Sequence, residues 1–197
     1  MKKYIKYQTG FTILELMIAT TVFSVVLLLC TYGLIEIGRN YYKGAAVART
    51  QNATRAALDD ISQSIQYGAA DPLFDEGNTV IPGIDRAICI GSKKYVVGAT
   101  HGITVEQTDN SCSIANLAAI PDKPRQQLLG ENMHLTKFSF DVDDSEYTVS
   151  MQVVFGDITD SDTFDTASST CKGGRNGQFC AASQLESTVR RRVKGGS

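Results

Sequence analysis

The chain has 197 residues, of which 43% are hydrophobic, and its formal net charge is −2. This length fits one modest domain with extensions, and the slightly acidic balance argues against a general nucleic-acid-binding protein, which would need a basic face. The hydrophobic residues are unevenly spread, and the first forty residues hold many of them.

The first predicted element is a long apolar helix. Residues 16–35 form a run of twenty residues without a formal charge, and at about 1.5 Å per residue a helix of that length covers roughly 30 Å, the hydrocarbon thickness of a bilayer. Apolar residues lie on every side of this run, as expected of a helix that faces lipid. We therefore predict a transmembrane helix and not the core helix of a soluble domain.

The charged residues around the run predict its orientation. Lys2, Lys3 and Lys6 precede it, and positive charge close to a first span stays cytoplasmic. The N-terminus is therefore expected in the cytoplasm and everything after about Ile37 outside. A secretory signal would have a shorter apolar core and a small-residue cleavage site directly after it. The nearest such site, Ala46-Val47-Ala48, lies well past the run, so we expect the span to stay in the mature protein.

A short motif stands at the start of this helix. Gly10-Phe11-Thr12-Ile13-Leu14-Glu15 follows a leader that carries the three lysines. This arrangement resembles the class III signal of type IV pilins and pseudopilins. The resemblance implies that a membrane prepilin peptidase cuts between Gly10 and Phe11. Residues 1–10 would then be a leader peptide, and the new N-terminal amine of Phe11 would be methylated.

Glu15 is the only acidic residue between the leader and Glu36. A charged side chain inside a bilayer costs about 2.5–3.5 kcal/mol at the centre and less near the interface, so it tends to be kept only with a partner or a role. The nearest expected cation is an N-terminal amine, either its own or that of a neighbouring subunit. We predict that Glu15 is an assembly residue, and the alternative is a carboxylate that merely reaches the interface.

The helix is expected to continue beyond the membrane, from about Thr12 to Tyr67. Residues 45–67 contain neither proline nor glycine. Residues at three- and four-residue steps form a one-sided stripe: Val47, Gln51, Thr54, Leu58, Ile61 and Ile65, with Ala53 and Ala57, while Asp59 and Asp60 face elsewhere. We divide the helix into a transmembrane and assembly half, residues 11–37, and an amphipathic half, residues 38–67.

A β-rich soluble head domain is predicted for residues 68–197. Alternating apolar residues and turn residues indicate strands at Ala87–Ile90, Tyr95–Val97, Ile103–Glu106, Leu135–Val142, Tyr147–Phe155 and Ser187–Val193. Residues 135–142 and 147–155 are expected to form an antiparallel hairpin with one buried face. The fold class is therefore α+β, a long N-terminal helix packed on an antiparallel sheet.

This order of elements matches the outline of the pilin family. The strong hairpin and the late Ser-Thr-Val-Arg-Arg-Arg strand resemble the larger minor pilins and the J-type minor pseudopilin. Residues 11–36 contain no proline, whereas major pilins of the family often carry one there, and this difference favours a minor component.

Four of the five cysteines fall on the predicted outer side, where disulfides persist: Cys89, Cys112, Cys171 and Cys180. Four cysteines allow three pairings, and the sequence does not choose among them. Short loops close most easily, which favours pairing in sequential order, and the alternative is free thiols. Cys30 lies within the apolar run.

Two charged clusters have competing interpretations. Asp157, Asp160, Asp162 and Asp165 could hold Ca²⁺ through carboxylate oxygens, although the sequence fits no EF-hand, and a solvated acidic loop is the favoured interpretation. We otherwise expect no cofactor and no metal site. Residues 190–194 form a basic stretch that could touch DNA phosphates, but an edge strand protected by charge is favoured. Nucleic acid is therefore not an expected partner.

We expect a structural protein and not an enzyme, because no nucleophile motif or phosphate loop occurs. The resemblance implies a minor pilin of a type IV pilus, in the filament or its tip complex, with roles in adhesion, twitching motility or DNA uptake. The alternatives are a minor pseudopilin of a type II secretion system and a membrane-stalked adhesin or DNA-binding head. The implied partners are other pilins, the prepilin peptidase and the inner-membrane assembly platform. The implied location is the cytoplasmic membrane and then an extracellular filament.

Overall fold

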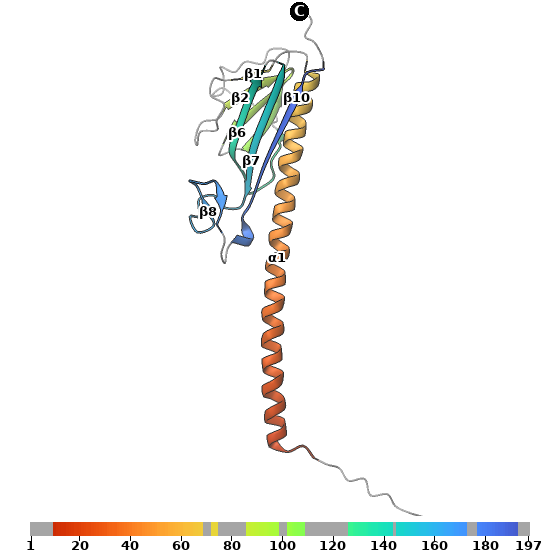
Figure 1. The fold of residues 1–197 in the computed structure, drawn as a ribbon, viewed down its shortest axis with the longest axis vertical. Helices are drawn as coiled ribbons and strands as arrows, with labels where there is room; N and C mark the ends of the chain where they lie inside the picture. Colours follow the sequence, from red (N-terminus) through yellow and green to blue (C-terminus); the bar gives the residue numbers. More distant parts are fainter. Residues whose placement is uncertain are drawn as a thin grey trace, which may run out of the picture. The chain divides into compact units, whose positions relative to one another are not determined.

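The computed structural model describes residues 10–68, 72–74, 86–98, 102–108, 126–143, 145–172 and 177–192. It contains one long helix, α1 (Ile13–Tyr67), followed by antiparallel strands (Figure 1). The predicted α+β class and the single helix from about residue 12 to residue 67 are confirmed. The chain divides into two compact units, residues 1–41 and 42–197. The amphipathic part of α1 therefore belongs to the same unit as the strands.

The first unit is the apolar part of α1. Its large apolar side chains, from Phe11 to Tyr41, are exposed. α1 is long and apolar enough to cross a membrane, and none of its most apolar window, of mean hydropathy 2.4, is buried within the structure. Its serine and threonine hydroxyl groups bond to the helix backbone; Ser24 and Thr31, for example, donate to the carbonyl oxygens of Thr20 and Leu27 at 2.7 and 2.8 Å. Such bonds let hydroxyl residues enter an apolar environment at little cost.

The second unit begins with the buried stripe of α1. Its buried members are Ala46, Thr50, Thr54, Ala57, Leu58, Ile61, Ser62 and Ile65. The predicted stripe is correct at Thr54, Ala57, Leu58, Ile61 and Ile65, but Gln51 is exposed and Thr50 takes the buried position. The Thr50 hydroxyl donates to the Ala46 carbonyl at 2.8 Å, and that of Thr54 donates to the Thr50 carbonyl at 2.7 Å. A threonine can therefore occupy this core position with its polar group paired.

The strands form three antiparallel sheets. The five-stranded sheet has the order β1 (Leu73–Phe74), β2 (Arg86–Ile90), β3 (Lys93–Gly98), β4 (Gly102–Gln107) and β5 (Gln126–Gln127). The three-stranded sheet has the order β10 (Ala181–Arg190), β7 (Glu146–Phe155) and β6 (Met133–Asp143). β8 (Phe164–Asp165) pairs with β9 (Thr170–Cys171), and a short 3₁₀ helix, η1 (Gly177–Phe179), precedes β10.

The predicted hairpin is present as β6 and β7, with a register shift between Leu135 and Lys137. The last strand begins at Ala181, six residues before the predicted start. β10 pairs with β7 along its whole length and lies beside the C-terminal part of α1. The Ser62 hydroxyl donates to Ser187 Oγ at 3.3 Å, and the main-chain N–H of Arg192 donates to the Gln66 carbonyl at 3.0 Å.

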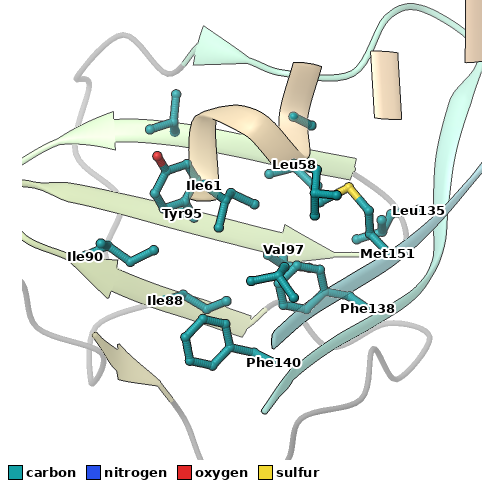
Figure 2. Packing of buried hydrophobic residues seen from close by; sticks show 14 of the residues in the cluster. Leu58, Ile61, Ile88, Ile90, Tyr95, Val97, Leu135, Phe138, Phe140 and Met151 are labelled. Atoms are coloured by element: carbon teal, nitrogen blue, oxygen red, sulfur yellow. The ribbon is translucent and has the colours of Figure 1, made fainter. Parts of the chain in front are cut away.

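One core joins the C-terminal part of α1 to the two larger sheets (Figure 2). Leu58, Ile61 and Ile65 of α1 pack in a single cluster with side chains from the five-stranded and three-stranded sheets. Tyr95, Phe140 and Met151 are among its largest fully buried members. Residues 42–67 are therefore part of the head, held by apolar burial on one helical face.

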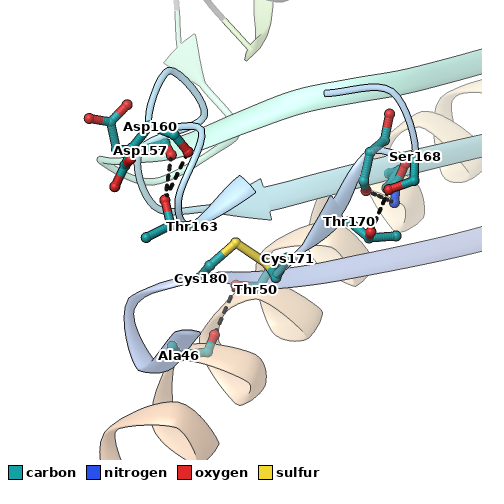
Figure 3. Close-up of a disulfide and its surroundings, with 11 residues drawn as sticks. Ala46, Thr50, Asp157, Asp160, Thr163, Ser168, Thr170, Cys171 and Cys180 are labelled. Atoms are coloured by element: carbon teal, nitrogen blue, oxygen red, sulfur yellow. Dashed lines mark hydrogen bonds between the residues drawn. A yellow bond between two sulfur atoms is a disulfide. The ribbon is translucent and has the colours of Figure 1, made fainter. Parts of the chain in front are cut away.

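A second, small cluster lies beneath the loop after β7. Val154, Phe164 and Cys180 are buried together, with Ile158 and Cys171 packed against them. Cys171 and Cys180 form a disulfide with their Cα atoms 5.6 Å apart (Figure 3). The bond joins β9 to the residue before β10 and holds the β8–β9 ribbon against the three-stranded sheet.

Replacing both Cys171 and Cys180 with serine is expected to lower the free energy of unfolding of the head by about 2–3 kcal/mol, because a loop of this length is no longer closed in the unfolded chain. Urea unfolding of the full chain in detergent micelles measures the change. Cys30→Ser is the control, since Cys30 is a free, exposed cysteine. Equal stability of the double variant and the control would contradict the prediction.

Candidate processing and assembly site

The residues of the predicted cleavage site lie outside the helix. Gly10, Phe11 and Thr12 precede α1 and have no regular secondary structure. A Cβ atom added at Gly10 would meet no described atom within 4 Å, and the Phe11 side chain is 84% exposed. The Gly10–Phe11 peptide bond is therefore sterically accessible within the described part of the chain, as a protease requires. Residues 1–9 of the predicted leader lie outside the described residues.

Thr12 caps the helix that begins at Ile13. Its Oγ1 accepts a hydrogen bond from the main-chain N–H of Glu15 at 3.2 Å, and its carbonyl accepts the first helical bond, from Leu16, at 3.2 Å. Thr12 is thus the N-cap and Glu15 the third helical residue, the spacing of a capping box. The sequence carries this Thr-x-x-Glu capping signal, although the apolar pattern that predicts the membrane span does not include it.

The Glu15 carboxylate lies in the first turn of α1. A negative charge there interacts favourably with the helix dipole. Glu15 is exposed, and its carboxylate has no hydrogen-bond or ion-pair partner among the described residues. Glu15 lies four residues after Phe11, a spacing of about 6 Å along a helical axis, so an accessible carboxylate stands about one turn from the Phe11 main-chain nitrogen.

The basic C-terminal stretch is largely engaged within the head. The Arg190 guanidinium pairs with the Glu146 carboxylate, with Nε 2.6 Å from Oε1. The Arg191 guanidinium donates to the Gly68 carbonyl at 3.1 Å. Gly68 directly follows α1, and a cation at the C-terminal end of a helix interacts favourably with the helix dipole. Lys194 lies outside the described residues. Two of the cations proposed for a DNA contact therefore hold the strand and the helix end in place.

The four aspartates of the predicted acidic loop are separated by local turns. Asp157 accepts hydrogen bonds from the Thr159 hydroxyl and N–H, which lower the pKa of its carboxyl group. The Ser168 hydroxyl and the Ala167 N–H do the same for the pKa of Asp165. Asp160 and Asp162 belong to the turn between them. Among the described residues no three acidic, histidine or cysteine side chains gather closely enough to hold a metal ion, and calcium binding stays an untested alternative to the favoured solvated acidic loop.

Of the remaining cysteines, Cys89 on β2 is disulfide-bonded. Its predicted partner, Cys112, lies outside the described residues, so that pairing stays a prediction.

A polar cluster joins α1 to β3. The Tyr95 hydroxyl donates to the Asp60 carboxylate at 2.7 Å, and the Lys93 ammonium donates to the same carboxylate at 2.9 Å. Since the one Tyr95 proton points to Asp60, the Ser64 hydroxyl, 2.7 Å away, donates to Tyr95. Burial raises the pKa of Tyr95 above its usual range, so the phenol stays protonated. The helical pattern predicted that Asp60 faces away from the packed side of the helix. This prediction is wrong, because Asp60 bonds to Tyr95 and Lys93 and links α1 to β3.

A small cavity of about 280 Å³ adjoins this cluster. Its lining combines the Asp60–Lys93 pair with glutamine side chains and apolar groups: Asp60, Lys93, Val105, Glu106, Gln107, Gln126 and Leu128. Pockets that bind drug-sized ligands usually measure about 300–1,000 Å³, so this cavity is at the lower limit for such a site.

Tyr95→Phe is expected to lower the free energy of unfolding by about 1–2 kcal/mol, because the buried hydrogen bond to a carboxylate is lost. Near-UV circular dichroism during urea unfolding of the full chain in micelles measures the change. Tyr67→Phe, at an exposed position on α1, is the matched control and should leave stability unchanged. The interpretation fails if the two variants have the same stability.

Comparison with known protein families matches the N-terminal part of the chain. The family described as the prokaryotic N-terminal methylation motif matches residues 5–31. This range includes the accessible Gly10–Phe11 bond, the Thr12 cap, Glu15 and most of the apolar run. No curated protein and no solved structure matches the chain.

Proposed function

Because the chain is a type IV pilin-like protein, carrying a prepilin-type N-terminus at residues 5–31, we propose that it is a minor pilin of a type IV pilus. One observation carries the proposal: an accessible Gly10–Phe11 bond lies directly before α1, and the Glu15 carboxylate in the first turn has no partner among the described residues. The apolar part of the helix that follows exposes its large side chains. The family is structural and non-enzymatic, and the proposed role is assembly.

The proposed mechanism has two steps. The prepilin peptidase hydrolyses the Gly10–Phe11 bond, which frees the Phe11 amine for methylation. The subunit then leaves the bilayer, and its apolar helix exchanges contacts with lipid for contacts with the helices of other subunits. Glu15 pairs with the protonated Phe11 amine of a neighbour, because in an apolar environment a carboxylate and an ammonium group attract each other strongly. This pair fixes the axial step between subunits.

The uninterrupted first half of α1 supports a minor and not a major subunit. Residues 13–41 are helical without a break, and residues 11–36 contain no proline. We further propose that the subunit is of the larger minor pilin or J-type pseudopilin kind, which the sequence resembles. The disulfide between Cys171 and Cys180 supports the proposed orientation, with the N-terminus in the cytoplasm and the head in an oxidising compartment.

Mass spectrometry of the mature N-terminus, in cells with and without the prepilin peptidase, tests the class of protein. We expect an N-methylated Phe11 in the first strain and an intact leader in the second. An uncut Met1 in both strains would remove the proposal.

The same N-terminal motif serves pseudopilins of type II secretion systems, which makes that system the second candidate. Deletion of the gene separates the two. A minor pilin predicts fewer surface filaments with normal secretion of folded enzymes, whereas a pseudopilin predicts the reverse.

A further inference from the structure

The helix segment directly after the apolar run is rich in aromatic and basic side chains. Arg39, Tyr41, Tyr42 and Lys43 follow one another within five residues of α1, and we call residues 39–43 the juxtamembrane segment. Tyr41 is 73% exposed and Tyr42 66% exposed, and both basic side chains are exposed. The segment therefore presents two large aromatic rings, with both apolar and polar parts, on the surface of the helix.

The position of the segment along the helix matches the headgroup layer of a bilayer. Ile35 ends the uncharged run, and Arg39 and Tyr41 follow it by about 6 and 9 Å along the axis. The headgroup layer beyond the hydrocarbon is about 5–8 Å thick. Side chains of an α-helix also lean toward its N-terminus, which here is the direction of the membrane. Tyr41, Tyr42 and Lys43 therefore reach back from their Cα positions into that layer.

The chemistry of these side chains fits phospholipid headgroups. A tyrosine ring places its apolar body at the acyl boundary and its hydroxyl among the polar groups. A guanidinium or ammonium group binds phosphate oxygens, and its aliphatic stem lies along apolar surface. Glu36 is the one acidic residue between Leu16 and Lys43, so the segment itself carries two positive charges and no negative charge.

We propose that the juxtamembrane segment binds the phospholipid headgroups of the leaflet that faces the head, with a preference for anionic lipids. The segment continues the membrane span along the same helix, and its charge complements that of the phosphates. The proposal depends on the span and not on the filament to which the subunit belongs. It gives each subunit a defined depth in the membrane before it is extracted.

Depth measurement in vesicles tests the position of the tyrosines. The full chain is labelled with 3-fluorotyrosine, and the ¹⁹F signals of Tyr41, Tyr42 and Tyr67 are assigned with Tyr→Phe variants. A phosphatidylcholine with a spin label on its headgroup should broaden the signals of Tyr41 and Tyr42. Tyr67, about 37 Å farther along the helix than Tyr42, should broaden only with a water-soluble relaxation agent. Equal responses of the three tyrosines to the headgroup label would overturn the proposal.

Lipid selectivity tests the charges. Spin-labelled phosphatidylglycerol and phosphatidylcholine are compared by electron paramagnetic resonance for their association with the full chain. We expect a preference of roughly twofold or more for phosphatidylglycerol, reduced by Lys43→Gln and reduced further by Arg39→Gln with Lys43→Gln, while Lys2, Lys3 and Lys6 at the other end of the span keep a remainder. Arg55→Gln, which removes an exposed charge farther along the same helix, should leave the preference unchanged. No preference in the unaltered chain, or an equal loss with Arg55→Gln, would overturn the proposal.

Discussion

Replacing Glu15 with alanine is expected to reduce the amount of this subunit in filaments at least about tenfold, which corresponds to a loss of about 1.4 kcal/mol or more in the assembly step. The physical reason is the loss of the only carboxylate in the membrane half of α1 that can pair with a neighbouring Phe11 amine. Immunoblots of sheared filaments against the membrane fraction measure the ratio.

The structure separates this effect from a defect in the helix. Thr12 caps α1 through the main-chain N–H of Glu15, not through its carboxylate, so the alanine variant keeps the capping bond. Alanine also favours helix more than glutamate does. Membrane insertion and cleavage after Gly10 should therefore stay normal.

Glu36→Ala is the matched control for this experiment. It removes one exposed carboxylate from the same helix, about 31 Å away along the axis, and should leave incorporation unchanged. If Glu15→Ala enters filaments at the wild-type level, the Glu15 carboxylate lies at the membrane interface without a role in assembly. An equal loss with Glu36→Ala would point to net charge and not to a specific pair.

The sequence predicted the elements whose patterns are local. The span, the helix to Tyr67 and the β6–β7 hairpin follow from apolar runs and from alternation, which depend on neighbouring residues alone. Gly10, Phe11 and Glu15 also lie in one short motif, and their roles in cleavage and assembly stay predictions. The two-residue strands β1, β5, β8 and β9 are too short to leave such a pattern.

Long-range contacts explain the errors. Asp60 looked like a solvent-facing residue, but Tyr95 and Lys93 meet it from a strand that lies more than thirty residues later in the chain. Ala181 and Ser183 are buried at the start of β10, although small residues give no apolar alternation. The helical pattern alone also does not show which of two neighbouring residues, Thr50 or Gln51, faces the core. The difference arises because the Thr50 hydroxyl can bond within its own helix.

Gly156→Ala is expected to be the most destabilising single substitution of those considered for the head, by about 3 kcal/mol or more. Gly156 follows β7 with φ +116°, and a Cβ there would lie 2.4 Å from the Phe179 carbonyl oxygen and 3.4 Å from the Cys180 Cα. Both obstacles are main-chain atoms. The disulfide holds Cys180 to Cys171, and the Gly156 N–H donates to the Asn132 carbonyl at 2.9 Å. The next residues on either side, Phe155 and Ala181, are paired in the sheet, so neither segment can move away at low cost.

The same substitution at Gly44 is the control for this prediction. Gly44 lies within α1, and an added Cβ meets no described atom within 4 Å, so Gly44→Ala should gain up to about 1 kcal/mol from helix propensity. For a domain of this size 1 kcal/mol corresponds to about 2–4 °C in Tm. Thermal unfolding of the full chain in micelles should therefore show a fall of about 6–12 °C for Gly156→Ala and no fall for Gly44→Ala. Equal Tm values would mean that the β7 end and η1 are not packed as tightly as these distances require.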